Sequence, residues 1–304
     1  MRTKNVMTVD VEDYFHVSAF SSVIDRKDWS NLECRVERNT HTLLELFHRQ
    51  GVQCTFFVLG WVAERYPGLV RDIAASGHEV ACHGLTHELV YRQTPEVFLS
   101  ETQRAKSVLE DIVQAPVIGY RAASYSIVKQ SIWALDILAD LGFQYDSSIF
   151  PVRHDRYGIP GSPRIPHRIS LGGGRGIVEF PLSTFRVANY DIPVAGGGYF
   201  RLFPYAFSKF ALRQVNERDR VPFIFYLHPW EIDPTQPRIK AGLVSRFRHY
   251  NNLTRCGARL EALTSDFEFG TAKSVLEGLG LLEAANTAAG ASGAQDREGS
   301  GIAA

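Results

Sequence analysis

Residues 80–87 read Val-Ala-Cys-His-Gly-Leu-Thr-His, a short apolar run that ends in two histidines. The apolar part is typical of a buried strand. His83 and His87 are four positions apart, about one helical turn, so both imidazoles can face the same way. Upstream, residues 6–13 (Val-Met-Thr-Val-Asp-Val-Glu-Asp) form another apolar run that ends in three carboxylates. Two neutral imidazoles and one carboxylate can bind a divalent cation with a position open for water, and a second carboxylate can deprotonate that water.

The first half of the chain alternates strand-like runs with amphipathic, helix-like segments. Gly51, Gly77 and Gly142 end three of the expected helices. We expect strands at residues 6–9, 52–59, 79–82, 117–120 and 143–145, and helices at residues 40–50, 62–76, 94–113 and 131–141. This alternation predicts parallel βαβ units and an α/β fold.

Three polar side chains come directly after predicted strands, namely Asp10, His83 and Arg121. In parallel α/β folds the reactive groups lie where the strands end. The shared placement of these three residues therefore predicts one site at the carboxyl edge of the sheet.

The second half of the chain has a different character. Residues 151–200 are rich in Pro, Gly and Arg and include two Gly-Gly-Gly runs, which favours β-hairpins and long loops. A helix is expected at 208–217, an apolar strand at 221–227 that ends at His228, and one or two helices over 243–263. Residues 284–304 are mostly Ala, Gly, Ser and Asn with scattered charges, and we expect them to be disordered.

Composition excludes several classes of protein. The chain has 304 residues, which suits two domains or one large α/β barrel. Its 33 Lys and Arg balance 33 Asp and Glu, so no nucleic-acid partner is expected. Four scattered cysteines predict no disulfide framework. No signal peptide or transmembrane run is visible, so we expect a cytoplasmic protein, with export by another route left open.

Taken in order, these motifs resemble the polysaccharide deacetylases of carbohydrate esterase family four. The resemblance implies a distorted (β/α) barrel in which residues 1–283 form one catalytic domain, with 151–283 as an extension that completes the barrel. Residues 178–230 are similar to a subgroup associated with bacterial exopolysaccharide (exosortase-linked) gene clusters. The motifs that carry the resemblance are residues 7–10, 55–60, 77–83 with His87, 119–125, 145–148 and 227–228.

The resemblance implies one divalent metal ion, zinc or a similar ion, held by His83, His87 and a carboxylate. The family has two adjacent Asp residues in its first motif, whereas Val11 follows Asp10 in this chain. Glu12 is favoured as the metal carboxylate because positions i and i+2 of a strand share a face. If the strand has already ended, Asp13 can reach the metal equally well, so both remain candidates.

The other roles also follow from the resemblance. Asp10 would be the catalytic base, and Arg121 would pair with it and keep it charged. His228, when protonated, would donate a proton to the leaving amine. The aromatic rings of Tyr125 and Trp230 are candidates for stacking on the sugar substrate.

The expected activity is removal of N-acetyl groups from amino sugars of a bacterial exopolysaccharide or its precursor, which is hydrolysis of a linear amide C–N bond. The partner is therefore an N-acetylated polysaccharide or oligosaccharide. Two alternatives remain, because a fold does not determine a function. One is hydrolysis of a small amide, and the other is an inactive carbohydrate-binding relative, which the presence of all the candidate catalytic and metal residues disfavours.

Overall fold

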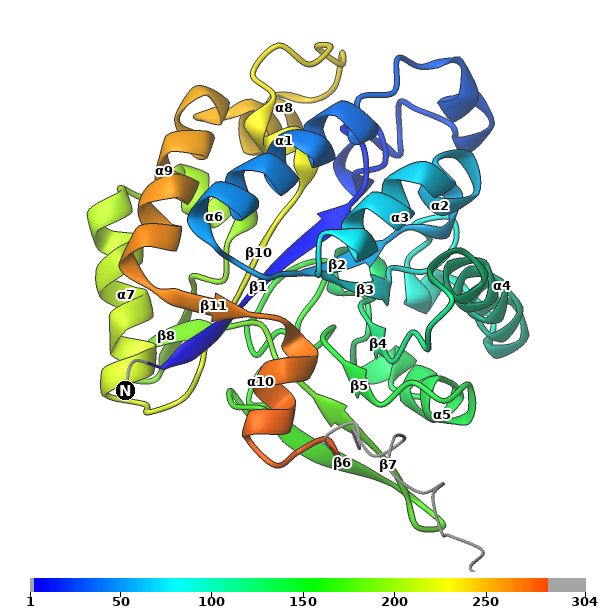
Figure 1. Cartoon of the computed structure of the whole chain (residues 1–304), viewed down its shortest axis with the longest axis vertical. Helices are drawn as coiled ribbons and strands as arrows, with labels where there is room; N and C mark the ends of the chain where they lie inside the picture. The colour runs from blue at the N-terminus through cyan, green and yellow to red at the C-terminus, as the bar shows by residue number, and fades with distance from the viewer. Residues whose placement is uncertain (1–2, 284–304) are drawn as a thin grey trace, which may run out of the picture.

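The computed structural model describes residues 3–283, so the expected disorder of residues 284–304 lies outside the described part of the chain. Within the described residues, nine strands form one sheet in the order β10-β1-β2-β3-β4-β5-β7-β6, with β11 also pairing with β1 (Figure 1). The sheet strands are β1 (Lys4–Val11), β2 (Thr55–Val58), β3 (Glu79–Cys82), β4 (Gly119–Tyr120), β5 (Tyr145–Asp146), β6 (His167–Gly172), β7 (Arg175–Glu179), β10 (Ile224–Leu227) and β11 (Glu268–Gly270). All neighbouring pairs are parallel except β6 with β7. The predicted α/β class with a parallel sheet is confirmed.

Helices cover the sheet, and their apolar sides fill one large core with the strands. The described helices are α1 (Val36–Gln50), α2 (Gly60–Arg65), α3 (Pro67–Ala75), α4 (Pro95–Val113), α5 (Ala134–Asp140), α6 (Gly197–Leu202), α7 (Tyr205–Glu217), α8 (Leu243–Tyr250), α9 (Leu253–Asp266) and α10 (Ala272–Gly278). None of these helices is long and apolar enough to cross a bilayer.

Strand alternation on β1 decides which side chains face the site. Met7 and Val9 belong to the core shared with the helices, whereas Val6 packs in a second cluster with Phe57 of β2. Asp10 is four residues after Val6, so the two side chains lie on the same face of β1. In the β1–β2 register Asp10 is paired with Phe57. Asp10 therefore points to the inner face of the sheet, at the carboxyl end of its strand.

One expected helix differs from the structure, and the segment expected to form one or two helices forms two. The helix expected at 62–76 is two helices, because the residue before Pro67 is forced out of the helical region and Tyr66 adopts φ −125° and ψ 57°. The segment 243–263 is also two helices, and the left-handed Asn252 (φ 52°) separates them. Both outcomes follow from local backbone chemistry.

The expected hairpins of the Gly-rich region are confirmed. β6 pairs with β7, and β8 (Thr184–Val187) pairs with β9 (Tyr190–Pro193), each antiparallel. After β9 the chain passes beside β10 through a parallel bridge between Gly196 and Tyr226. A Cβ atom on Gly196 would lie 1.9 Å from the carbonyl oxygen of Tyr226, so this close approach requires glycine.

Candidate active site

Polar side chains converge at the carboxyl ends of adjacent parallel strands. Asp10 lies near the end of β1, and His83, Arg121 and His228 directly follow β3, β4 and β10. The carboxyl ends of parallel strands meet at one edge of the sheet, which brings together residues more than 200 positions apart. A cavity of about 440 Å³ opens at this edge. Its lining includes Asp10, Glu12, His83, His87 and His228.

Glu12, His83 and His87 form a buried group that could hold a metal ion, with one ligand atom of each residue within 4.8 Å of the others. Glu12 Oε2 lies 2.7 Å from His87 Nε2. His83 Nδ1 lies 2.8 Å from the carbonyl oxygen of Arg121, which accepts its proton and leaves Nε2 free as a ligand. The two histidines do not share a helix, because His87 adopts a left-handed conformation with φ 54°.

The chemistry of this group fits a divalent cation. Glu12 Oε2 is buried and has no hydrogen-bond partner among the described residues, although an imidazole nitrogen is close. Burial would raise the pKa of Glu12, but His87, His228 and His83 lower it well below its usual range, so the carboxylate is charged. Burial lowers the pKa of His83 to about 4, which keeps its imidazole neutral. A charged carboxylate and neutral imidazoles are the protonation states that metal binding requires.

Asp10 and Arg121 form a buried ion pair beside the metal group. Arg121 Nη1 lies 2.6 Å from Asp10 Oδ1 and donates also to Thr8 Oγ1 at 2.7 Å. Two further hydrogen bonds, to the carbonyl oxygen of Ser147 (3.1 Å) and its hydroxyl (3.0 Å), fix the guanidinium. Its plane lies over the ring of Phe57, 4.1 Å from the centroid. Asp10 is therefore held rigidly, with Oδ1 paired and Oδ2 toward the cavity side chains of Tyr125 and His228.

His228 completes the cluster from the opposite side. Its Nε2 lies 3.4 Å from Glu12 Oε1 and 3.9 Å from Asp10 Oδ2. Its Nδ1 lies 2.8 Å from Glu231 Oε1, and Glu231 Oε2 is paired at 2.5 Å with the buried Arg201. Burial would lower the pKa of His228, but Glu12, Glu231 and Asp10 raise it to about 9. The imidazole is therefore oriented by Glu231 and can carry a proton at neutral pH.

Comparisons with known proteins agree with this architecture. Residues 28–145 match the polysaccharide deacetylase family, and residues 147–277 match a domain of unknown function, DUF3473. The polysaccharide deacetylase match covers less than half of the chain, so it shows what this part of the chain is similar to. The structure assigned as a polysaccharide deacetylase from Mycobacterium smegmatis has a TM-score of 0.58 at 19% identity and covers 90% of both chains. The PuuE allantoinase has a TM-score of 0.57 at 13% identity, covering 90% of this chain and 89% of its own. At these identities the likeness shows the fold alone.

Curated relatives match over shorter stretches. The chitooligosaccharide deacetylase of Bradyrhizobium sp. is 31% identical over 100 residues, which is 33% of this chain and 43% of that protein. The peptidoglycan-N-acetylglucosamine deacetylase of Bacillus cereus is 27% identical over 79 residues, 26% of this chain and 37% of that protein. In both matches the chain spans less than half the length of the relative.

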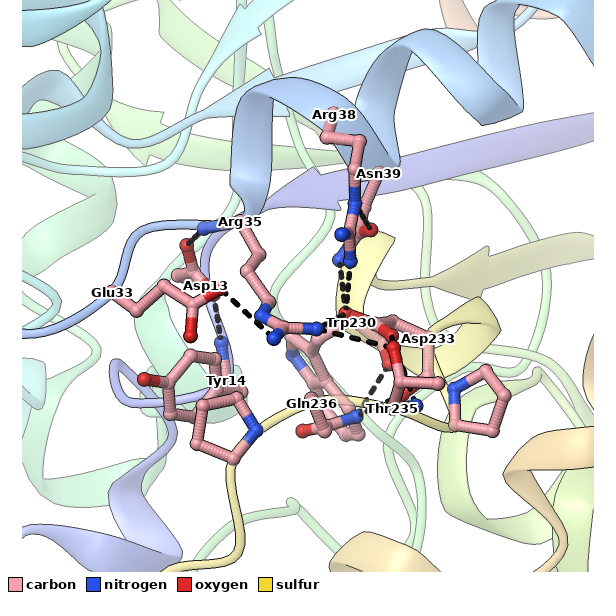
Figure 2. A network of polar contacts seen from close by, with 12 residues as sticks. Asp13, Tyr14, Glu33, Arg35, Arg38, Asn39, Trp230, Asp233, Thr235 and Gln236 are labelled. Carbon is pink, nitrogen blue, oxygen red and sulfur yellow. Dashed lines mark hydrogen bonds and ion pairs between the residues drawn. The ribbon is translucent and has the colours of Figure 1, made fainter.

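Asp13, the alternative metal carboxylate, lies outside the metal group and holds the start of α1 (Figure 2). Its Oδ2 accepts hydrogen bonds from the backbone N–H groups of Arg35 (2.5 Å) and Val36 (2.8 Å). These N–H groups have no partner within the helix, and the helix dipole favours a carboxylate there. Strand β1 ends at Val11, which was the condition under which Asp13 could have reached the metal. However, the backbone N–H of Glu12 donates to the carbonyl oxygen of Asp10, and this turn directs the Glu12 side chain to the cavity.

The two aromatic candidates for substrate binding have different positions. Tyr125 lines the cavity, and its hydroxyl lies 3.5 Å from Asp10 Oδ2. Trp230 does not line the cavity and is only 5% exposed, because the short 3-10 helix η6 (Pro229–Ile232) turns it beneath His228. Its ring is stacked between those of His228 and His249, with centroids 4.9 and 4.1 Å away. The expectation that Trp230 stacks on a sugar is therefore wrong, and its place is in the support of His228.

Sequence reasoning missed several residues of the site. Glu231 is three positions after His228, a spacing that could have suggested a carboxylate partner for the imidazole. Thr8 and Ser147 lie in motifs that carried the resemblance, but nothing in their sequence context predicted their bonds to Arg121. Arg201 follows the glycine run 196–198, and only the fold brings it to Glu231.

Proposed function

We propose that this protein is a metal-dependent hydrolase that removes N-acetyl groups from amino sugars. The observation that carries the proposal is the buried Glu12/His83/His87 group with a paired carboxylate, Asp10, and a protonatable imidazole, His228, in the same cavity. The match of residues 28–145 to the polysaccharide deacetylase family supports this substrate class. So do the printed activities of the chitooligosaccharide and peptidoglycan-N-acetylglucosamine deacetylases that the chain resembles.

The substrate that we propose more narrowly is a bacterial exopolysaccharide or its precursor. The support is the resemblance of residues 178–230 to the subgroup associated with exopolysaccharide gene clusters. The metal that we propose is zinc, since two imidazoles and a carboxylate with an open position are typical of catalytic zinc sites.

The protein residues divide the proton transfers between them. A divalent ion held by Glu12, His83 and His87 would supply a Lewis acid for the acetamide carbonyl and the attacking water. Asp10 accepts the proton of that water through Oδ2, while Arg121, which donates to Oδ1, holds the carboxylate in position. His228 donates a proton from Nε2 to the departing amine nitrogen, and Glu231 on Nδ1 holds the ring in place.

The test is acetate release from N-acetylglucosamine oligomers and from exopolysaccharide, with and without chelator. We expect chelation to abolish turnover and added zinc to restore it. Asp10→Asn should lower kcat by about 10²- to 10⁴-fold, the range for loss of a general base, while zinc content remains unchanged. Asp111→Asn makes the same chemical change at an exposed position of α4 and should leave turnover intact.

Three results would contradict the proposal. Turnover that survives complete metal removal would refute metal dependence. Glycan binding without acetate release would favour the inactive carbohydrate-binding relative. Hydrolysis of cyclic or small amides with no acetate released from any saccharide would favour a small-amide hydrolase.

A further inference from the structure

Helix α8 presents an apolar side to solvent. Leu243, Val244 and Phe247 are 81%, 64% and 58% exposed, respectively. Their spacing places them on one side of the helix, and the other side carries His249, which is buried against Trp230. Adjacent large apolar side chains with this exposure mark an interaction surface rather than ordinary surface composition.

The surroundings of this apolar side are strongly basic, although the whole chain has no net charge. Residues 234–260 contain six Lys and Arg and no Asp or Glu. Lys240, Arg246 and Arg248 are exposed, and none of them forms an ion pair with another residue in the described range 3–283. Exposed apolar residues flanked by unpaired cations are the pattern of a helix that lies in the interface of an anionic membrane.

The same surface adjoins the catalytic cavity. Phe247 and Arg248 line the cavity together with Leu202 at the end of α6, which is itself 47% exposed. Figure 1 places α8 on the side of the molecule toward which β1 runs, the side that carries the strand ends of the site. A surface bound to α8 would therefore lie next to the mouth of the cavity.

We propose that the α8 face docks on an anionic lipid surface, where the α8 face means Lys240, Leu243, Val244, Arg246, Phe247 and Arg248. A second copy of the chain is a poorer occupant, because a two-fold dimer through this face would bring its unpaired cations together. Anionic headgroups supply the missing negative charge, and acyl chains cover the apolar side chains. Docking would present the cavity to saccharides held at the membrane. It does not depend on the proposed chemistry.

The test is sedimentation of the full chain with vesicles of phosphatidylcholine alone or mixed with phosphatidylglycerol. We expect binding only to the mixed vesicles, and weaker binding as ionic strength rises. Lys240→Glu/Arg246→Glu should weaken partition by at least about 25-fold, since each cation contributes roughly a factor of five. Leu243→Ser/Val244→Ser should weaken it at least roughly ten-fold. None of these four residues lines the cavity.

Two control variants make the same kinds of substitution at exposed positions outside the α8 face. Arg71→Glu/Lys129→Glu makes an equal change in net charge at exposed positions, and Val187→Ser/Tyr190→Ser removes two exposed apolar side chains from the β8–β9 hairpin. Both controls should bind vesicles as the wild type does.

The inference is overturned if the wild type fails to bind mixed vesicles, or if controls and α8 variants lose binding equally. It is also overturned if light scattering shows a dimer that Leu243→Ser/Val244→Ser dissociates while vesicle binding is absent. Acetate release from soluble oligomers is measured in parallel, so failure of docking and failure of the chemistry are separate results.

Discussion

Replacing Arg121 by Met should destabilise the protein strongly, because Asp10 would remain buried without its counter-charge. The exposed fractions are 0% for Arg121 and 2% for Asp10, and the pair is joined at 2.6 Å. Removing one partner of a buried ion pair costs about 3–5 kcal/mol. Arg121 also donates to the carbonyl and hydroxyl oxygens of Ser147, and unpaired buried acceptors add to the cost. We expect Arg121→Met to lower the free energy of unfolding by at least about 4 kcal/mol.

A double-mutant cycle isolates the ion pair from the rest of this loss. Asp10→Asn and Arg121→Met each leave one unpaired buried charge, whereas the double variant leaves none. The double variant should therefore lose less stability than the sum of the singles, by about 2 kcal/mol or more. Urea unfolding followed by circular dichroism measures all four proteins, with metal chelated throughout so that metal binding does not contribute. Arg175→Met, which breaks exposed pairs with Asp136 and Asp140, is the control and should cost less than about 1 kcal/mol. Additivity within about 0.5 kcal/mol would refute the reasoning.

Three further predictions concern residues that support the site. Burial would raise the pKa of Glu231, but Arg201 and the neighbouring imidazole lower it to about 2, below its usual 4.5. The charged form of Glu231 therefore stabilises the fold fully above pH 4.5, and this stabilisation is lost as the pH falls toward 2. The difference in the free energy of unfolding between wild type and Glu231→Gln, measured by urea unfolding, should become smaller over that pH range. A difference that grows as the pH falls would contradict this. Trp230→Ala should lower the free energy of unfolding by about 3–5 kcal/mol, because a buried ring is removed. A raised KM with unchanged stability would instead indicate a sugar-stacking role for Trp230. Gly196→Ala should cost at least about 2 kcal/mol through strain and the clash with Tyr226, and an unchanged melting temperature would show that the bridge to β10 can shift.

Much of the fold was predictable because its signals are local. The alternation of apolar runs with amphipathic segments predicted the parallel sheet, and the positions after those runs predicted where Asp10, His83, Arg121 and His228 would lie. Even the break of the expected helix 62–76 had a local signal in Pro67, which restricts the residue before it. Backbone periodicity and turn chemistry act over a few residues, so a single sequence contains them.

Strand alternation favoured Glu12 over Asp13 as the metal carboxylate but did not decide between them, because two adjacent carboxylates have nearly the same chemistry. The position of the start of α1 decided it, since the free N–H groups of Arg35 and Val36 bind Asp13.

By itself, the sequence determined an α/β protein with reactive groups at the ends of its strands. The tertiary structure alone decided which of those groups touch, how Trp230 is buried, and that Arg201 reaches Glu231 across 30 positions. The physical reason is the distance along the chain over which each interaction acts. The periodicity of helices and strands depends on residues a few positions apart, whereas a side chain's hydrogen-bond partner is often a distant residue that only folding brings close.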